Sequence, residues 1–197
     1  AMAISCNPQM LIADEPTTAL DVTIQAQILE IMRNLKSEFN MGIMLITHDL
    51  GVVAEMADRV AVMYAGRVVE IRNINDLYAD AQHPYTEGLL NSIPGATEER
   101  KRLHVIYGSV PNLLDLPSGC TFRDRCEHAT DRCAAEKPEL IEVKPGAWVA
   151  CHNFKDSRTR DQNKIKLSSE GKASIDNRAD REDRVPLVKV EQLVKEF

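Results

Sequence analysis

The sequence predicts an α/β protein, made of half of a three-layer domain followed by a small loop-rich region. Three observations favour this fold class. Short apolar stretches over residues 10–14 and 43–47 are typical of buried parallel strands. Between them, apolar residues recur at helical spacing from residue 23 to residue 39, which predicts an amphipathic helix. Strands and helices that alternate along a chain favour a parallel sheet with helices packed on it.

Turn and cap residues delimit the other elements of this first region. Residues 43–47 contain no polar alternation, so we expect a strand that is covered on both faces. Asp49 can cap a helix that ends near Met56. Residues 59–64 and 67–71 are expected to form a hairpin around the turn Ala65–Gly66.

After residue 73 the pattern becomes irregular. We expect short helices over residues 74–78 and 85–92, followed by a loop-rich segment that contains four of the five cysteines. Residues 155–184 are dense in charged residues and poor in large apolar ones, which predicts a flexible linker. Strand-like apolar residues return near the end, as if another domain began there. The predicted regions are therefore 1–72, 73–154, 155–184 and 185–197.

The composition is typical of a soluble globular protein, with 44% hydrophobic and 27% charged residues. A formal net charge of -6 argues against nucleic acid as a partner, because binding phosphates requires a concentrated basic face. No apolar run approaches the roughly 20 residues that a membrane-spanning helix needs, and no signal-peptide pattern is present. We therefore expect a cytosolic location, with docking on a membrane protein left open.

Two adjacent carboxylates close the first strand. Strands of open α/β sheets direct their last side chains toward ligands. Asp14 is thus placed to hold magnesium, and Glu15 to accept a proton from, or orient, a water that attacks a phosphate. His48 ends the next strand, and in a parallel sheet it would lie beside Glu15 and could contact the same phosphate. The alternatives are a turn that caps a core strand and a histidine with only local partners.

Taken together, three motifs resemble those of ABC-transporter ATPases. Leu11–Thr17 is similar to the Walker B strand, Ala19–Asp21 to the D-loop, and Ile46–Asp49 to the switch-histidine loop. The order and spacing of the three motifs also match. The resemblance covers residues 1–154 and implies an incomplete P-loop NTPase (ABC ATPase) core with a small C-terminal extension.

The resemblance also implies functional roles. Asp14 would bind Mg²⁺, Glu15 and His48 would be catalytic with ATP as substrate, and Asp21 would lie at the contact with a second ATPase domain. The family's phosphate-binding loop, Q-loop glutamine and Leu-Ser-Gly-Gly signature do not occur in the sequence. We therefore expect the chain alone neither to bind ATP tightly nor to hydrolyse it.

A second set of residues resembles the ATPase subunits of dipeptide and oligopeptide importers. His83–Thr86 with Leu89–Leu90 is similar to the start of their C-terminal extension. Five, six and seventeen residues separate the four cysteines, which are Cys120, Cys126, Cys133 and Cys151. Disulfides are not expected in a reducing compartment, and the spacing alone leaves an iron-sulfur cluster, zinc and unligated thiols open. The same pattern in peptide-importer ATPases is associated with a [4Fe-4S] cluster, so the resemblance implies these four residues as its ligands.

The resemblance finally implies an ATP-hydrolysing subunit that energises peptide import from the cytoplasmic face of the membrane. Its partners would be a second ABC ATPase domain, two transmembrane permeases and, indirectly, an extracytoplasmic peptide-binding protein. Residues 186–197 resemble the first strand of such a second domain, which suggests a tandem arrangement. An iron-sulfur or zinc-binding regulatory module on an α/β scaffold is the alternative, and a truncated, inactive product is a third. The sequence does not identify the transported substrate, since importers of nickel and other solutes have similar ATPases.

Overall fold

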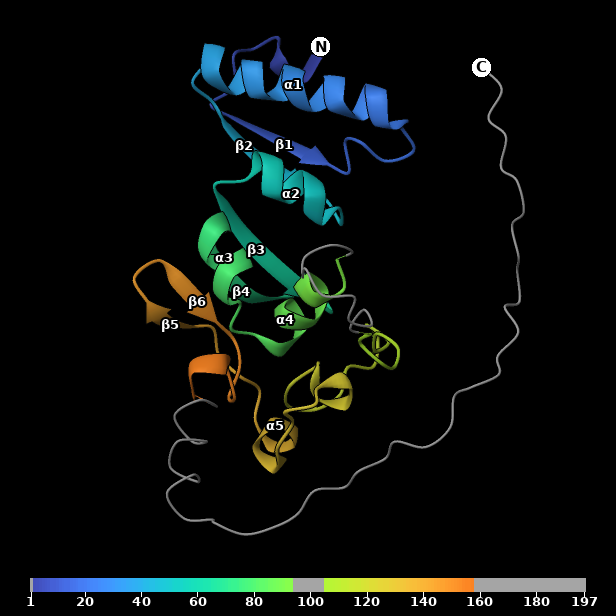
Figure 1. Cartoon of the computed structure of the whole chain (residues 1–197), viewed down its shortest axis with the longest axis vertical. Helices are drawn as coiled ribbons and strands as arrows, with labels where there is room; N and C mark the ends of the chain where they lie inside the picture. The colour runs from blue at the N-terminus through green and yellow to red at the C-terminus, as the bar shows by residue number, and fades with distance from the viewer. Residues whose placement is uncertain (1, 94–104, 158–197) are drawn as a thin grey trace, which may run out of the picture.

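Two β-sheets organise the fold of residues 2–93 and 105–157, which are the residues that the computed structural model describes (Figure 1). The first sheet pairs β1 (Met10–Asp14) with β2 (Gly42–Ile46), and the second has the strand order β3-β4-β6-β5. The other elements, in chain order, are a 3-10 turn (Met2–Ile4), α1 (Val22–Glu38), α2 (Leu50–Met56), β3 (Arg59–Tyr64), β4 (Arg67–Asn73), α3 (Ile74–Asp80), α4 (Pro84–Asn91), a second 3-10 turn (Arg123–Arg125), α5 (Asp131–Ala135), β5 (Ile141–Lys144) and β6 (Ala147–Val149). This mixture of helices and strands confirms the predicted α/β class.

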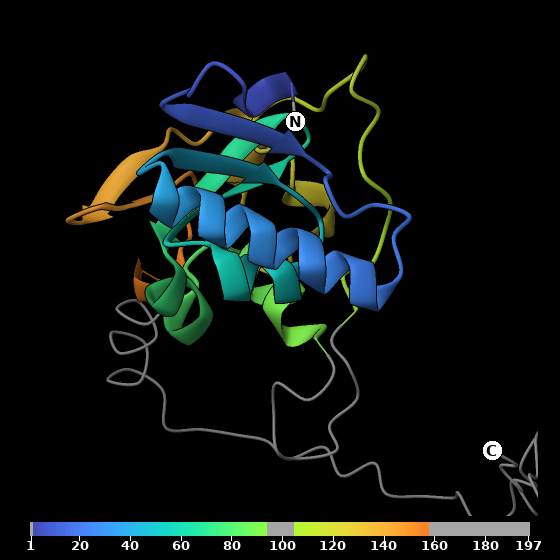
Figure 2. The same cartoon turned by 90° about the horizontal axis from the view of Figure 1, so that it is seen from above.

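The first sheet is parallel, as predicted, and its register pairs Met10 with Gly42 and Asp14 with Ile46. Its two strands therefore end at the same edge. The connection between them is α1, which runs alongside the sheet in both views (Figures 1 and 2). Asp21 caps this helix, because its carboxylate accepts hydrogen bonds from the backbone N–H groups of Thr23 and Ile24.

The prediction that the strand over residues 43–47 is covered on both faces is wrong for the part of the chain that the structure describes. Met44 is 48% exposed and Ile46 42%, and on the neighbouring strand Ile12 is 63% exposed. The described helices leave this face of β1 and β2 open. The unbroken apolar run in the sequence indicated a strand face that other groups could cover. It did not show which residues cover that face.

The second sheet begins with the predicted hairpin. β3 and β4 are antiparallel, and Ala65 and Gly66 both have left-handed backbones, with φ of 46° and 74°. Two consecutive left-handed residues form the turn that matches the twist of a two-residue hairpin. The helices expected over residues 74–78 and 85–92 are also present, as α3 and α4.

Strands β5 and β6 were not predicted, and they join the two regions of the chain. β6 pairs with β4, where Glu70 lies opposite Val149 and Ile71 opposite Trp148. The sheet therefore contains strands from both sides of the boundary expected at residue 72. Of the expected linker only residues 155–157 are described, and the backbone N–H of Lys155 donates to the carbonyl of Gln82 at 3.0 Å. The remainder of the linker and residues 185–197 lie outside the described residues.

An aromatic cluster packs the loop from Cys120 to Cys126, called the cysteine loop below, against the hairpin of β3 and β4. Phe122 is buried, and its ring lies edge-on to Tyr64 at the end of β3, with 5.1 Å between ring centroids. Tyr85 of α4 completes the cluster, 4.8 Å from Tyr64 and 5.4 Å from Phe122. The cysteine loop is thereby fixed to β3 and α4.

Among the described residues, no helix is both long and apolar enough to cross a membrane.

Candidate functional site

The parallel register brings two predicted catalytic residues into contact at the C-terminal edge of the first sheet. The backbone N–H of Glu15 donates to the carbonyl of Ile46 at 2.9 Å, which extends the β1-β2 pairing by one residue. His48, two residues further along, then lies with Nδ1 2.9 Å from Glu15 Oε1. The expected proximity of Glu15 and His48 is confirmed, whereas their chemical roles stay predictions.

Glu15 is held in an unusual backbone conformation. Its φ is 48°, in the left-handed region that residues with a side chain seldom occupy. Strained backbones of this kind concentrate at functional sites, where the surroundings fix the direction of a side chain. Here the hydroxyl of Thr18 donates to Glu15 Oε2 at 2.6 Å, so both carboxylate oxygens are hydrogen-bonded. The motif analysis missed Thr18, although its place three residues after Glu15 in a tight turn was a usable signal.

Glu15 and His48 shift each other's protonation in opposite directions. The hydrogen bond from His48, and then that from Thr18, lower the pKa of Glu15. The same carboxylate raises the pKa of His48 above its ordinary value of 6.5, through the hydrogen bond and the charge attraction. Both side chains are accessible to solvent, so salt will weaken the attraction. A carboxylate beside an imidazolium is the form that these shifts favour near neutral pH.

We expect the Glu15–His48 pair to contribute stability over a defined pH range. The contribution is complete below the ordinary pKa of His48, 6.5, and disappears as the pH rises through the raised value. On the acid side it is complete above the ordinary pKa of Glu15, 4.5, and disappears as the pH falls through the lowered value. Histidine NMR titration should give His48 a midpoint above 6.5, and Glu15→Gln should move that midpoint downward.

Glu30→Gln is the matched control for this titration, because Glu30 is an exposed carboxylate on α1. It should leave the His48 midpoint unchanged. Equal His48 midpoints in the Glu15→Gln protein and in the unsubstituted protein would contradict the pairing.

The other two predicted residues of this site have different surroundings. Asp14 is exposed at the end of β1, next to Glu15, where a carboxylate can reach a ligand at the sheet edge. Asp21 is already engaged as the cap of α1, with Oδ1 3.0 Å from the backbone nitrogens of Thr23 and Ile24. The cap gives Asp21 a structural role in this chain, and its role in a contact between ATPase domains stays a prediction.

The four predicted cysteines lie near one another, with Cys133 on α5 and the other three in the loops around it. The backbone N–H of Cys120 donates to the carbonyl of Cys133 at 2.8 Å, which joins the loop of Cys120 to α5. The pKa of Cys151 is raised to about 12, chiefly by burial and to a smaller extent by the nearby thiols of Cys126, Cys120 and Cys133, while the hydrogen bond from the backbone N–H of Asn153 opposes the rise. Cys133 is buried and the other three are half-buried. These thiols are thus close enough to influence one another's ionisation.

Hydrogen-bond donors are directed at several of these sulfur atoms. The backbone N–H of Asn153 donates to Cys151 Sγ at 3.3 Å. Backbone N–H groups of Phe122 and Arg123 favour the thiolate form of Cys120, although burial has the larger effect and raises the pKa of that thiol. In the described part of the chain, no group of three or more His, Cys, Asp or Glu side chains is positioned to hold a metal ion. The donors therefore suit thiolate ligands, but the side chains do not converge on one point.

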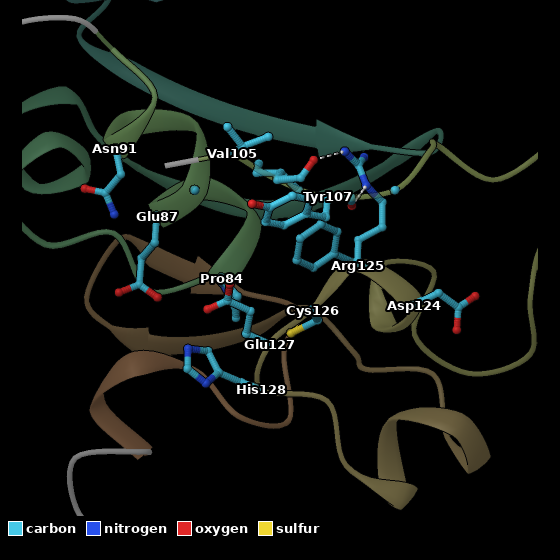
Figure 3. Close-up of a pocket in the computed structure, with 14 residues that line it drawn as sticks. Pro84, Glu87, Asn91, Val105, Tyr107, Asp124, Arg125, Cys126, Glu127 and His128 are labelled. Carbon is cyan, nitrogen blue, oxygen red and sulfur yellow. Dashed lines mark hydrogen bonds between the residues drawn. The ribbon is translucent and has the colours of Figure 1, made fainter. Parts of the chain in front are cut away.

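A pocket of about 410 Å³ lies beside the cysteine loop (Figure 3). Glu87 of α4 lines one side, Cys126 lines the other, and Arg125 lies above Cys126. The guanidinium of Arg125 donates to the carbonyls of Tyr107 at 2.9 Å and Ile106 at 3.1 Å. Arg125 thus fixes a segment that lines this pocket.

Comparison with known proteins first shows which class of protein the chain resembles. It is similar in sequence to ATP-binding proteins of ABC transporters, the class to which the sheet-edge carboxylates and histidine also point. Residues 69–133 match the family profile described as the C-terminal region of oligopeptide/dipeptide transporters. Residues 69–133 are thus similar to the C-terminal region of that family.

Three relatives illustrate the similarity. The oligopeptide transport ATP-binding protein AppD of Bacillus subtilis is 56% identical over 156 residues, covering 79% of this chain and 48% of that protein. The dipeptide transport ATP-binding protein DppD of Escherichia coli is 50% identical over 152 residues, which cover 77% of this chain and 46% of that protein. The oligopeptide transport ATP-binding protein OppD of Escherichia coli is 52% identical over 151 residues, which cover 77% of this chain and 44% of that protein. The chain therefore spans about half the length of these relatives.

Among solved structures, cbiO1 of Clostridium perfringens, part of the ABC transporter complex cbiONQ, is similar over 36% of this chain and 29% of its own. The two are 35% identical in sequence, with a TM-score of 0.34.

Proposed function

We propose that this chain supplies the carboxylate and histidine side of an ATP-hydrolysing site in an ABC transporter that imports peptides. The observation that carries the proposal is the 2.9 Å contact between Glu15 and His48 at the ends of two parallel strands. Ligands of open α/β sheets bind at this edge. The sequence similarity to peptide-transport ATP-binding proteins supports the same function.

The residues at this edge suit the substrates that the proposal names. Asp14 offers an exposed carboxylate, and Mg²⁺ is commonly held by one or two carboxylates together with phosphate oxygens and water. A bound Mg²⁺ would offset phosphate charge. Glu15, deprotonated at neutral pH because His48 and Thr18 stabilise its carboxylate, would orient a water molecule and accept its proton. His48 would hold Glu15 in position and donate a hydrogen bond toward the terminal phosphate.

The proposal includes partners that complete the site. The sequence holds no phosphate-binding loop, so we expect the purified 197-residue chain to show no catalytic ATP turnover. A second ABC ATPase domain would meet this one near Asp21, and two permeases would place the assembly on the cytoplasmic face of the membrane. A peptide-binding protein would deliver the substrate on the other side. Nickel or another solute in place of peptide would leave this catalytic chemistry unchanged.

Substitution of Glu15 tests the proposed chemistry in the assembled transporter. Glu15→Gln keeps the size of the side chain and removes the proton acceptor. We expect ATP turnover to fall by about 100-fold or more while ATP binding persists, as for loss of a general base. Glu30→Gln on α1 is the control and should retain full turnover. Normal turnover by the Glu15→Gln transporter would refute the assignment.

We further propose that Cys120, Cys126, Cys133 and Cys151 hold an iron-sulfur cluster. Four neighbouring thiols and backbone N–H donors directed at their sulfurs match the ligand chemistry of such clusters. The cysteine side chains would have to rotate toward one another on binding. The cluster would join α5 to loop segments that are far apart in the sequence. Iron and acid-labile sulfide in anaerobically prepared protein would support the iron-sulfur cluster. Stoichiometric zinc would instead show that the four cysteines form a zinc site.

A separate regulatory module is the competing function for the cysteine region, and one feature disfavours it. β6 pairs with β4, and Phe122 packs against Tyr64, so the cysteine loops share a sheet and a core with the hairpin. A region integrated in this way suits a structural contribution to the ATPase subunit better than an independent sensor.

A further inference from the structure

We infer that Thr18 is a positioning residue that aims the carboxylate of Glu15 for the proposed catalytic step. This inference rests on the proposed function and assigns a further residue to it. The hydroxyl of Thr18 donates to Glu15 Oε2 at 2.6 Å, and His48 Nδ1 lies 2.9 Å from Glu15 Oε1. Thr18 lies in the turn after β1, whereas His48 follows β2. Two different parts of the fold therefore hold the two oxygens of one carboxylate.

The contact with Thr18 restricts a motion that a single contact would leave open. The terminal torsion of a glutamate side chain has broad preferences, so a carboxylate held by one oxygen can still rotate. With Thr18 on one oxygen and His48 on the other, the plane of the Glu15 carboxylate is defined. Thr18 thus contributes an orientation that His48 alone does not provide.

The turn that carries Thr18 is itself held by hydrogen bonds. The backbone N–H of Thr18 donates to the carbonyl of Glu15 at 3.1 Å, so the backbone and the side chain of Thr18 both contact the same residue. The backbone N–H of Leu20 donates to the carbonyl of Thr17 at 3.3 Å, and Thr17 is only 8% exposed. The hydroxyl of Thr18 therefore starts from a defined backbone position.

The backbone of Glu15 depends on such contacts. Its φ of 48° is unfavourable for a residue with a side chain, and Pro16 directly after it favours an extended backbone at Glu15. A conformation of this kind persists only where the surroundings fix it. Thr18 belongs to these surroundings, because both of its hydrogen bonds end on Glu15.

Orientation of a proton acceptor affects the chemical step more than substrate binding. A misplacement of about 1 Å can cost about 100-fold in rate. Removal of the Thr18 hydroxyl leaves the carboxylate of Glu15 in place but less well aimed, so we expect a smaller loss of about 10-fold. The loss should appear in kcat and leave KM for ATP unchanged, because the orientation matters only when the proton moves.

A purely structural role of Thr18 in the turn is the alternative, and His48 distinguishes the two roles. Glu15 raises the pKa of His48 through their hydrogen bond and charge attraction, and the charge of Asp49 adds to this rise. A Glu15 carboxylate that rotates away raises the pKa of His48 less, while Asp49 keeps its effect. A structural role would lower the stability of the protein without a change at His48.

The first test is a histidine NMR titration of the purified chain without ATP. Thr18→Val keeps the branched shape and the backbone N–H but removes the hydroxyl. It should lower the titration midpoint of His48, and Thr18→Ser, which keeps the hydroxyl, should show the midpoint of the unsubstituted protein. Thr23→Val, at an exposed threonine of α1, is the control and should not change the midpoint. An unchanged or raised midpoint in Thr18→Val would overturn the inference.

The second test measures ATP turnover by the assembled transporter. Thr18→Val should lower kcat about 10-fold at an unchanged KM, whereas Thr18→Ser and Thr23→Val should keep normal turnover. If Glu15→Gln also keeps normal turnover, the proposed function fails and the inference fails with it. If Glu15→Gln abolishes turnover but Thr18→Val behaves like Thr23→Val, the inference alone is overturned. A loss in Thr18→Val that Thr18→Ser shares would also overturn it, because the hydroxyl would then not be responsible.

Discussion

Gly119→Ala is expected to destabilise the protein by about 3 kcal/mol and to open the cysteine region. Gly119 has φ of 70°, a left-handed conformation that costs a residue with a side chain roughly 1–2 kcal/mol. A methyl group there would also overlap the carbonyl oxygen of Cys133 and lie 2.7 Å from that of Ala134. Backbone atoms cannot move aside as a flexible side chain can, and overpacking adds about 1–3 kcal/mol. Urea unfolding would measure the loss of stability, and thiol labelling would report the exposure of Cys133.

Gly146→Ala is the control that measures the backbone part of this effect without the steric part. Gly146, in the turn between β5 and β6, has φ of 74°, but nothing lies within 4 Å of the added methyl group. It should therefore cost only about 1 kcal/mol, from the backbone conformation alone. If both substitutions destabilise the protein equally, the close approach of Gly119 to the end of α5 has no energetic importance.

Glu70→Ala is expected to cost about 3–5 kcal/mol, because it leaves buried polar groups without partners. Glu70 is fully buried on β4, and its two carboxylate oxygens accept hydrogen bonds from the backbone N–H groups of Gln82 at 2.8 Å and His83 at 2.9 Å. The buried guanidinium of Arg72 lies 3.8 Å away and also donates to the carbonyl of Asp80. Burial raises the pKa of Glu70, while the two N–H groups and Arg72 oppose that rise. Thermal and urea unfolding would measure the effect.

Glu136→Ala is the comparison for Glu70. Glu136 is exposed and pairs with Arg132 one helical turn away at 2.9 Å. Exposed pairs of this kind contribute little to stability, so Glu136→Ala should cost much less than Glu70→Ala. Equal losses from Glu70→Ala and Glu136→Ala would show that the turn between α3 and α4 does not depend on Glu70.

The sequence predicted the first region well because local patterns determine it. Apolar periodicity identified β1, α1 and β2, and the parallel register then placed His48 beside Glu15. The pairing of β6 with β4 escaped prediction because it joins residues nearly eighty positions apart. Strand β6 has only three residues, too few to show alternation. Glu70 was missed for a similar reason, since its partners Gln82 and His83 come from a loop that no local pattern connects to β4.

The candidate sites show the same division. Motifs identified Asp14, Glu15, His48 and the cysteines, whose chemistry depends on residue type. They gave no information on the hydrogen-bond partners Thr18 and Asn153, because a threonine or an asparagine is equally common in unrelated turns. The spacing of Asn153 two residues after Cys151 was a signal, since a backbone N–H at that distance can reach the sulfur. Only the folded chain shows that its side chain also reaches Cys133.

The position of β4 between β3 and β6 decides how this protein can be divided. A chain shortened at Asn73, the end of β4, would lose β6 and expose the unpaired edge of β4, together with Val69 and Glu70, which are now buried. Unpaired strand edges promote association with other chains. Experiments that seek a minimal folded piece of this protein should therefore keep the segment through Val149, because a cut after the hairpin would yield a fragment that associates with other chains instead of an autonomous domain.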